Sequence, residues 1–170
     1  NVWELIALAN KHPRVNILQP GAGVGGHCIA VDPWFLVSDF PAESNLIGQA
    51  RKINNYKAFW CAEKVQNAIL QFKITNGTEP RVALMGLAFK PDIDDLRESP
   101  AKYIAEKVMQ SANNSEFMVV EPNVESHKAF KLSNCQEAYE KADIVAFLVA
   151  HKEFRTLAYH DNKVILDFAG

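Results

Sequence analysis

The sequence predicts an α/β fold, in which a long central helical region precedes a C-terminal domain built on a parallel sheet. Two observations support this prediction. Four short apolar segments lie between residues 81 and 167 and alternate with helical patterns, which is typical of a parallel sheet covered on both faces. Upstream, residues 42–72 carry apolar side chains at helical spacing. We therefore expect a central region at 1–76 and a C-terminal domain at 77–170.

The bulk composition is that of an ordinary globular chain. Its 170 residues are 48% hydrophobic and 22% charged, with a net charge of −2. The lack of a basic excess argues against nucleic acid as a partner, and no apolar run is long enough for a membrane span. Three cysteines at unrelated spacings argue against a disulfide framework and for a reducing cytoplasm. Because the chain opens within a helical pattern and without Met, we expect it to be a domain fragment.

The central region reads as helices joined by one long loop. Residues 2–11 form a helical pattern that Pro13 stops, and a short helix covers residues 34–37. The main helix is expected from about residue 42 to 72, with Pro41 tolerated near its start. Its apolar stripe follows about 45 Å of helix, longer than a small core can cover. We therefore expect a homodimer formed through the helix at 41–72.

The C-terminal half alternates strands and helices. A helix from Pro100 to about Gln110 is capped by Ser99, and residues 135–141 form a short second helix. Right-handed crossovers between parallel strands make this half Rossmann-like. The four expected strands are 81–86, 116–120, 143–149 and 163–167.

The most informative stretch is a glycine-rich loop that ends in a cysteine. Within residues 19–33, Cys28 follows a run of four glycines and Asp32 follows Cys28. Such a run is costly on folding unless something must approach the backbone closely, so we expect the loop to wrap a ligand. A thiolate is the natural nucleophile there, and Asp32 is a candidate base. Cys61 and Cys135 lack this context and are interpreted as structural.

A second candidate site is the loop between the strand at 81–86 and the helix at 100–110. Ligands of open α/β sheets bind beyond the carboxyl ends of strands, so Lys90 and Arg97 are placed to meet phosphates. No G-x-G-x-x-G follows the strand, so nothing indicates that this half binds NAD by itself. The histidines show no spacing for a metal, and we expect none; the three considered are His127, His151 and His160.

Both stretches resemble the signatures of one family. Residues 23–28 with 31–33, and residues 86–90 with 94–100, are similar to the cysteine loop and the second signature of the UDP-glucose/GDP-mannose dehydrogenase family. The resemblance implies oxidation of a sugar C6 alcohol to a carboxylate, using NAD+ twice without releasing the aldehyde, in polysaccharide biosynthesis. It also implies that Cys28 holds the aldehyde as a thiohemiacetal and then a thioester, while Asp32 helps to activate water.

The same resemblance assigns further roles. Arg97 matches a residue near NAD. The resemblance implies substrate contacts for Gly25 in the glycine loop and for Phe89 and Lys90 in the C-terminal domain. It also implies contacts for His12 and Arg14, which reach the substrate across a dimer. The family's NAD domain and its catalytic Lys and Asn match no residue of this sequence, and its last substrate-contacting Arg would follow Gly170. We therefore expect the 170-residue chain alone to be inactive.

The identity of the sugar follows from one departure from the family pattern. Val31 stands where members acting on UDP-glucose carry Lys, which disfavours UDP-glucose. Residues 31–35 and 1–16 are most similar to members that oxidise UDP-N-acetyl-D-mannosamine, with UDP-N-acetylglucosamine as an alternative substrate. Two other interpretations remain: a nucleotide-sugar binding or dimerisation module without chemistry, and a thiol acyltransferase. The last lacks a His base paired to Cys28, because adjacent His27 is expected to point elsewhere.

Overall fold

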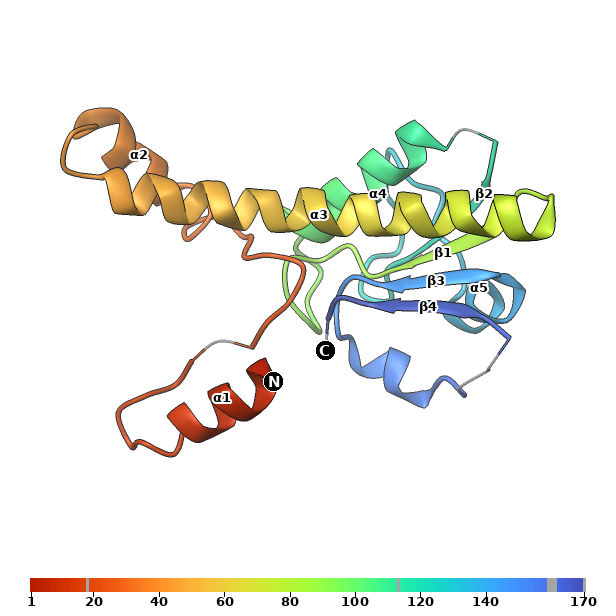
Figure 1. Ribbon diagram of the computed structural model, residues 1–170, viewed down its shortest axis with the longest axis horizontal. Coiled ribbons are helices and arrows are strands. Elements are labelled where there is room, and N and C mark those ends of the chain that lie inside the picture. Colours follow the sequence, from red (N-terminus) through yellow and green to blue (C-terminus); the bar gives the residue numbers. More distant parts are fainter. Residues whose placement is uncertain (18, 113, 159–161, 170) are drawn as a thin grey trace.

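A four-stranded parallel sheet forms the centre of the molecule. The computed structural model describes residues 1–17, 19–112, 114–158 and 162–169. The strand order is β2-β1-β3-β4, and every neighbouring pair is parallel (Figure 1). This confirms the predicted α/β class. The strands are β1 (Arg81–Met85), β2 (Glu116–Val120), β3 (Ile144–Phe147) and β4 (Val164–Asp167).

Helices cover both faces of the sheet, as the continuous apolar strands predict. The helices α3 (Asn45–Asn76) and α4 (Pro100–Ser111) pack on one face, and α5 (Cys135–Lys141) with the short 3-10 helix η1 (Lys152–Thr156) packs on the other. Side chains of β1 alternate between these two cores. Val82 and Leu84 join the first, whereas Ala83 and Met85 join the second, as the two-residue period of a strand requires.

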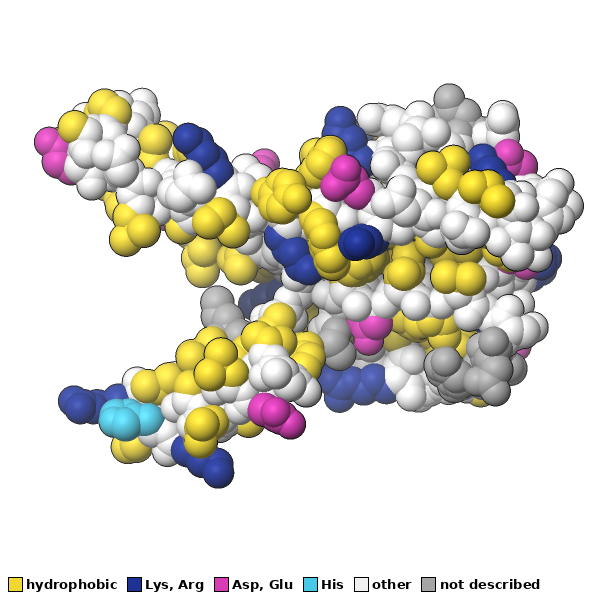
Figure 2. Space-filling model, in the orientation of Figure 1, with side chains coloured by type: hydrophobic (Ala, Val, Ile, Leu, Met, Phe, Trp, Pro, Cys, Tyr) yellow, Lys and Arg dark blue, Asp and Glu magenta, His cyan; other side chains and the backbone are white. Residues whose placement is uncertain are grey.

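The long helix α3 has two environments along its length. Its C-terminal half packs on the sheet and on α4, where Cys61, Val65 and Ile69 are almost completely buried. Its N-terminal half extends beyond the sheet and carries α2 (Asp32–Asp39), while α1 (Val2–Ala9) stands apart from the α/β body (Figure 1). Hydrophobic side chains are exposed on α1 and along the protruding part of α3 (Figure 2).

The ends of two predicted helices differ from the structure. The helix α3 begins at Asn45 rather than near 42, because residues 41–43 form a turn in which the Ser44 hydroxyl donates to the Phe40 carbonyl (2.6 Å). It continues to Asn76 rather than Phe72 and ends where Gly77 adopts the left-handed conformation (φ 69°). The helix α1 ends at Ala9, two residues before its predicted end. Among the described residues, no helix is long and apolar enough to cross a bilayer.

Candidate active site

The glycine loop, residues 21–31, docks directly on the loop that follows β1, residues 86–99. The Gly26 N–H donates to the Arg97 carbonyl (3.2 Å). A Cβ at Gly25 would collide with the Glu98 carbonyl oxygen and would lie 2.7 Å from Pro100 Cδ. Only glycine therefore allows the two loops to touch at this point, and segments some seventy positions apart in the sequence form one surface.

The glycine run makes room for the protein itself. Gly26 has a φ of +98°, and a Cβ there would lie 3.0 Å from the Phe89 ring; Gly23 has a φ of +146° and faces Pro100 at 3.1 Å. From the sequence alone, we expect a ligand to approach these glycines. In the structure the loop after β1 occupies the space beside Gly25 and Gly26, and Pro100 at the start of α4 lies beside Gly23, so loop docking explains the lack of a side chain at Gly25 and Gly26.

A side chain of α3 holds the start of the glycine loop. The Asn54 Oδ1 accepts the Val24 N–H (2.7 Å), and its Nδ2 donates to the Val24 carbonyl (3.0 Å). One amide thereby satisfies both backbone polar groups of one residue, as a neighbouring strand would. This contact was not predicted, because it joins positions thirty residues apart and no local pattern signals it.

Cys28 lies on the outer side of this loop. Its thiol is exposed, and its carbonyl accepts the N–H groups of Val31 (3.0 Å) and Asp32 (2.8 Å) in the turn that leads into α2. Asp32 is the first residue of α2 and is exposed. The two residues predicted to carry the chemistry are therefore joined by one backbone hydrogen bond, one turn apart.

His27 corrects one expectation. From the sequence alone, we expect this side chain to point away from Cys28, because the two residues are adjacent. In the structure the His27 Nδ1 lies 2.9 Å from the Cys28 Sγ. The turn after Cys28 is not extended, so consecutive side chains need not diverge as they do along a strand. A Cys–His pair is therefore present, so the lack of a His base beside Cys28 no longer argues against a thiol acyltransferase.

The other two cysteines differ from Cys28 in burial. Cys61 is fully buried in α3, and Cys135 is half-buried at the start of α5. Burial raises the pKa of both thiols above the ordinary value, since it disfavours the charged form. Both environments suit structural side chains better than nucleophiles.

An ion pair flanks the Cys28–His27 pair. The Arg97 guanidinium contacts the Asp95 carboxylate at 2.6 Å. Hydrogen bonds from the side chain and backbone of Arg97 lower the pKa of Asp95 to about 2. The same pairing raises the pKa of Arg97, and the charge of Cys28 adds to that shift. The predicted cofactor residue Arg97 therefore lies within electrostatic range of the thiol and already has a counter-ion.

The predicted substrate pair Phe89–Lys90 also lies at this junction. The Phe89 N–H donates to the Asp95 carbonyl (3.1 Å), which closes the loop, and its ring faces Gly26. Lys90 is exposed, with its ammonium 5.8 Å from the centre of the Phe89 ring. The structure thus brings Phe89, Lys90, Arg97 and the Cys28 loop together.

His12 and Arg14 are not brought to this junction within one chain. Both are exposed in the loop after α1, where the Arg14 N–H donates to the His12 Nδ1 (3.3 Å). Figure 1 shows that this loop extends away from the α/β body. Within one chain, His12 and Arg14 therefore do not contact the junction of the two loops.

A buried carboxylate holds the other end of the β1–α4 loop. Glu121 follows β2 directly, and its side chain is 0% exposed. It accepts the Leu87 N–H (2.7 Å), the Ala88 N–H (2.9 Å) and a hydrogen bond from the His151 Nε2 (3.1 Å). Burial alone would raise the pKa of Glu121, but these hydrogen bonds outweigh it and the pKa lies below the ordinary value. Sequence reasoning missed Glu121, although an acidic residue directly after a buried strand is a usable signal.

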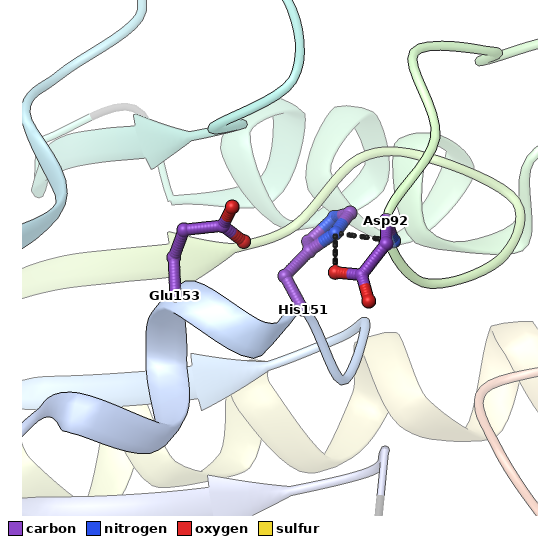
Figure 3. Close-up of side chains that lie close together, drawn as sticks. All are labelled: Asp92, His151 and Glu153. Carbon is purple, nitrogen blue, oxygen red and sulfur yellow. Dashed lines mark hydrogen bonds and ion pairs between the residues drawn. The ribbon is translucent and has the colours of Figure 1, made fainter.

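His151 completes this buried network. Its Nδ1 accepts the Asp92 N–H (3.0 Å), while the Asp92 carboxylate accepts the Lys152 N–H (3.0 Å). Asp92 has a positive φ of 60°. The side chains of Asp92, His151 and Glu153 bring potential metal-ligand atoms within 4.8 Å of one another (Figure 3). Because a backbone N–H already occupies the Nδ1 lone pair, the arrangement serves to anchor the loop.

The remaining histidines of the sequence analysis lie elsewhere. The His127 Nδ1 accepts the Ala129 N–H (3.1 Å), and His160 lies outside the described residues.

One cavity borders the junction, and another lies at the edge of the sheet. One, of about 320 Å³, lies between the glycine loop, α3 and the start of α4, and its polar lining includes Arg51, Asn55 and Glu98. The other, of about 210 Å³, lies beyond the carboxyl ends of β3 and β4, next to His151 and Arg155. The second cavity occupies the edge at which open α/β sheets bind ligands.

Comparisons with known proteins agree with the fold and with both sequence signatures. The UDP-binding domain of the UDP-glucose/GDP-mannose dehydrogenase family matches residues 83–170, and the central domain of that family matches residues 1–56. A UDP-N-acetyl-D-mannosamine dehydrogenase from Campylobacter jejuni is 52% identical over 172 residues, covering 97% of this chain and 40% of that protein.

Two further relatives span a similar share. An NDP-N-acetyl-D-galactosaminuronic acid dehydrogenase from Ralstonia nicotianae is 46% identical, covering 100% of this chain and 40% of that protein. The solved structure of a UDP-D-ManNAc dehydrogenase from Pyrococcus horikoshii superposes with a TM-score of 0.81 at 33% identity, again over 100% and 40% of the respective chains. The chain thus spans about 40% of the length of the relatives it matches. It belongs to the UDP-glucose/GDP-mannose dehydrogenase family.

Proposed function

We propose that this chain is part of an NAD-dependent nucleotide-sugar 6-dehydrogenase that oxidises UDP-N-acetyl-D-mannosamine to UDP-N-acetyl-D-mannosaminuronate. The observation that carries the proposal is the docking of the exposed Cys28 thiol loop on the loop that bears Phe89 and Lys90. The name of the Campylobacter jejuni relative supports the choice of sugar.

In the proposed reaction, Cys28 acts on the aldehyde formed at the sugar C6. The thiolate adds to the aldehyde carbon, forming a C–S bond, and the carbonyl oxygen takes up a proton. After the second oxidation the resulting thioester is hydrolysed: a water oxygen attacks the carbon, the C–S bond breaks, and the sulfur leaves as thiolate. Asp32, one turn after Cys28, is the proposed acceptor of the proton of that water.

NAD is proposed to bind mainly to a part of the longer enzyme outside this chain. No glycine fingerprint follows β1, and the carboxylate after β2 is engaged by Leu87, Ala88 and His151 instead of being free for a ribose. The oxidation steps are therefore not assigned to residues of this chain. Arg97 is proposed only as a contact of the cofactor at the edge of the site.

Cations of the β1–α4 loop are proposed to hold the UDP-sugar. Lys90 is exposed above Phe89 and has the charge that a diphosphate requires. The backbone of the loop at Gly25 is proposed to contact the sugar, while its Cβ direction is filled by the β1–α4 loop. His12 and Arg14 are proposed to reach the same substrate from the second copy of a homodimer.

We further propose that the chain divides at residues 76 and 77 into a dimerising region and a UDP-sugar-binding domain. The half of α3 that protrudes from the sheet supports the dimerising role, because its apolar side chains lack cover within one chain, while its other half packs on the sheet. A cytoplasmic setting is proposed because free thiols persist in a reducing compartment.

Substitution of Cys28 in the longer enzyme that contains this chain tests the proposal. Cys28→Ala should abolish formation of the carboxylate, whereas Cys61→Ala should retain it, because Cys61 is buried away from the loop junction. Normal turnover by both variants would show that Cys28 is structural. The 170-residue chain by itself should form no NADH from UDP-N-acetyl-D-mannosamine and NAD+, and appreciable NADH would contradict the proposal.

A further inference from the structure

We propose that His27 is a catalytic residue whose imidazole takes the thiol proton of Cys28 and holds the sulfur as a thiolate. The role in catalysis rests on the proposed function, since it is Cys28 that would attack the aldehyde. The proton transfer itself is a property of this chain and is tested below without sugar or cofactor.

The geometry of the pair is direct. The His27 Nδ1 lies 2.9 Å from the Cys28 Sγ, and both side chains are exposed. This nitrogen is therefore within hydrogen-bond reach of the thiol, which is the first requirement for a base. An exposed pair also leaves the sulfur accessible to an incoming carbonyl carbon.

The backbone around the pair is held on both sides. Before it, the Gly26 N–H donates to the Arg97 carbonyl (3.2 Å). After it, the N–H groups of Val31 and Asp32 close a turn on the Cys28 carbonyl. Because both flanks are fixed, the contact between adjacent side chains follows from the loop conformation and does not depend on a free chain end.

The proton transfer is balanced within the pair. In the neutral imidazole the proton sits on Nε2, so the Nδ1 lone pair faces the thiol. The S–H bond breaks, its proton moves to Nδ1, and the products are a thiolate and an imidazolium. Opposite charges at this distance stabilise each other, and a thiolate beside a protonated histidine is the reactive form of cysteine.

Charged groups of the neighbouring elements favour this state. Arg97, on the β1–α4 loop, is within electrostatic range of Cys28. Asp95 on the same loop is within electrostatic range of His27, and it forms an ion pair with Arg97 at 2.6 Å. Asp32 opens α2 one turn after Cys28, and Arg51 of α3 lines the cavity beside Ala30.

The test measures the reactivity of one thiol against pH. The 170-residue chain is treated with iodoacetamide from pH 5 to 10, and alkylation of Cys28 is followed by mass spectrometry of its peptide. In that reaction the sulfur forms an S–C bond and iodide leaves. We expect the midpoint of Cys28 alkylation to lie at lower pH in wild type than in the His27→Ala variant. His27→Ala should raise this midpoint and slow alkylation at pH 7 about 10-fold, which corresponds to one pKa unit.

Two further variants separate proton transfer from simple packing. His27→Gln keeps a polar side chain but cannot take the proton, so it should behave like His27→Ala. His127→Ala, which removes an imidazole remote in sequence from the loop, should leave the Cys28 profile unchanged. Thermal unfolding followed by circular dichroism establishes that each variant is folded. An unchanged midpoint in His27→Ala, or a wild-type midpoint in His27→Gln, overturns the proposal.

The outcome is independent of the proposed function. A shifted profile together with a longer enzyme that lacks dehydrogenase activity would overturn the function and leave the role of His27 toward the thiol standing. An unshifted profile together with a Cys28-dependent dehydrogenase would overturn the role of His27 alone.

Discussion

The side-chain amide of Asn54 pairs with both backbone polar groups of Val24, at 2.7 and 3.0 Å. This relationship fixes the glycine loop, four residues before Cys28, to the N-terminal half of α3. The part of α3 that extends beyond the sheet therefore also supports the loop that contains the proposed nucleophile, Cys28.

Asn54→Ala should loosen the glycine loop. Loss of two hydrogen bonds at a partly exposed position should lower the free energy of unfolding by about 1–2 kcal/mol. Hydrogen exchange measured by mass spectrometry should show faster exchange in the peptide that contains Val24. Asn55→Ala, at the exposed neighbouring position of the same helix, is the control and should exchange like wild type. Equal protection in both variants would show that Asn54 does not hold the loop.

Gly25→Ala should disrupt the docking of the two loops. Its Cβ would collide with the Glu98 carbonyl and approach Pro100 Cδ to 2.7 Å, so backbone must move. We expect a loss of about 1–3 kcal/mol in urea unfolding, the usual cost of overpacking. At Gly21, where nothing lies within 4 Å of the added carbon, the same substitution should change stability by less than about 0.5 kcal/mol. Similar losses at both positions would contradict the docking.

Glu121→Gln should destabilise the protein in a pH-dependent way. A buried carboxylate that accepts hydrogen bonds from three backbone N–H groups and from the His151 and Asn123 side chains is replaced by a group that can satisfy only part of them, at a cost of about 2–4 kcal/mol at pH 7. Because the folded pKa of Glu121 is lowered, its contribution is present above the unfolded value of about 4.3. It is lost as pH falls through the folded pKa.

Urea unfolding at several pH values measures this effect. The stability difference between wild type and Glu121→Gln should therefore be constant from pH 8 to 6 and should narrow below about pH 4. A difference that does not change over this range would mean that the ionised form of Glu121 contributes nothing to stability.

The protruding half of α3 should mediate association of two chains. Leu46 is 83% and Ile53 59% exposed on this half, and exposed apolar surface of this kind marks an interface. Sedimentation velocity at tens of micromolar should show a dimer for wild type. A monomer should appear for the Leu46→Glu, Ile53→Glu double variant. Asn55→Glu adds charge to the same helix on another face and should leave the dimer intact; a monomeric wild type would contradict the prediction.

The longer enzyme should prefer a UDP-2-acetamido sugar to UDP-glucose. Val31 precedes Asp32 at the start of α2, so the position next to the proposed site is apolar instead of cationic. A site with polar partners for the acetamido group rejects a sugar that leaves them unpaired. The measurement is kcat/KM for UDP-N-acetyl-D-mannosamine, UDP-N-acetylglucosamine and UDP-glucose at equal ionic strength. An equal or higher value for UDP-glucose would contradict the preference.

The sheet was predictable because its signal is local. Strands buried on both faces appear as unbroken apolar runs, so the predicted strand at 116–120 has the same bounds as β2. The predicted helix at 135–141 likewise has the same bounds as α5. The start of α3 was placed too early because Pro41 is compatible with a first turn. The hydrogen bond from Ser44 to Phe40 that delays the helix is visible only in three dimensions.

The candidate site was predictable only in part. The glycine context singled out Cys28, and the position of Lys90 and Arg97 after a buried strand was enough to place them at the sheet edge. The Asn54 and Glu121 contacts join positions 30 and 34 residues apart, so no spacing rule reveals them. His27 was misjudged because adjacency in sequence says little about side-chain direction where the chain turns.

The contact at Gly25 also has a consequence for evolution and engineering. The backbone of Glu98 fills the place that a side chain at Gly25 would occupy. The surfaces of residues 21–31 and 86–99 are therefore complementary, and a change in one requires a matching change in the other. A graft of either segment alone from a relative would bring an unmatched surface to the junction. Exchange of substrate preference between members of the family should therefore succeed when both segments travel together.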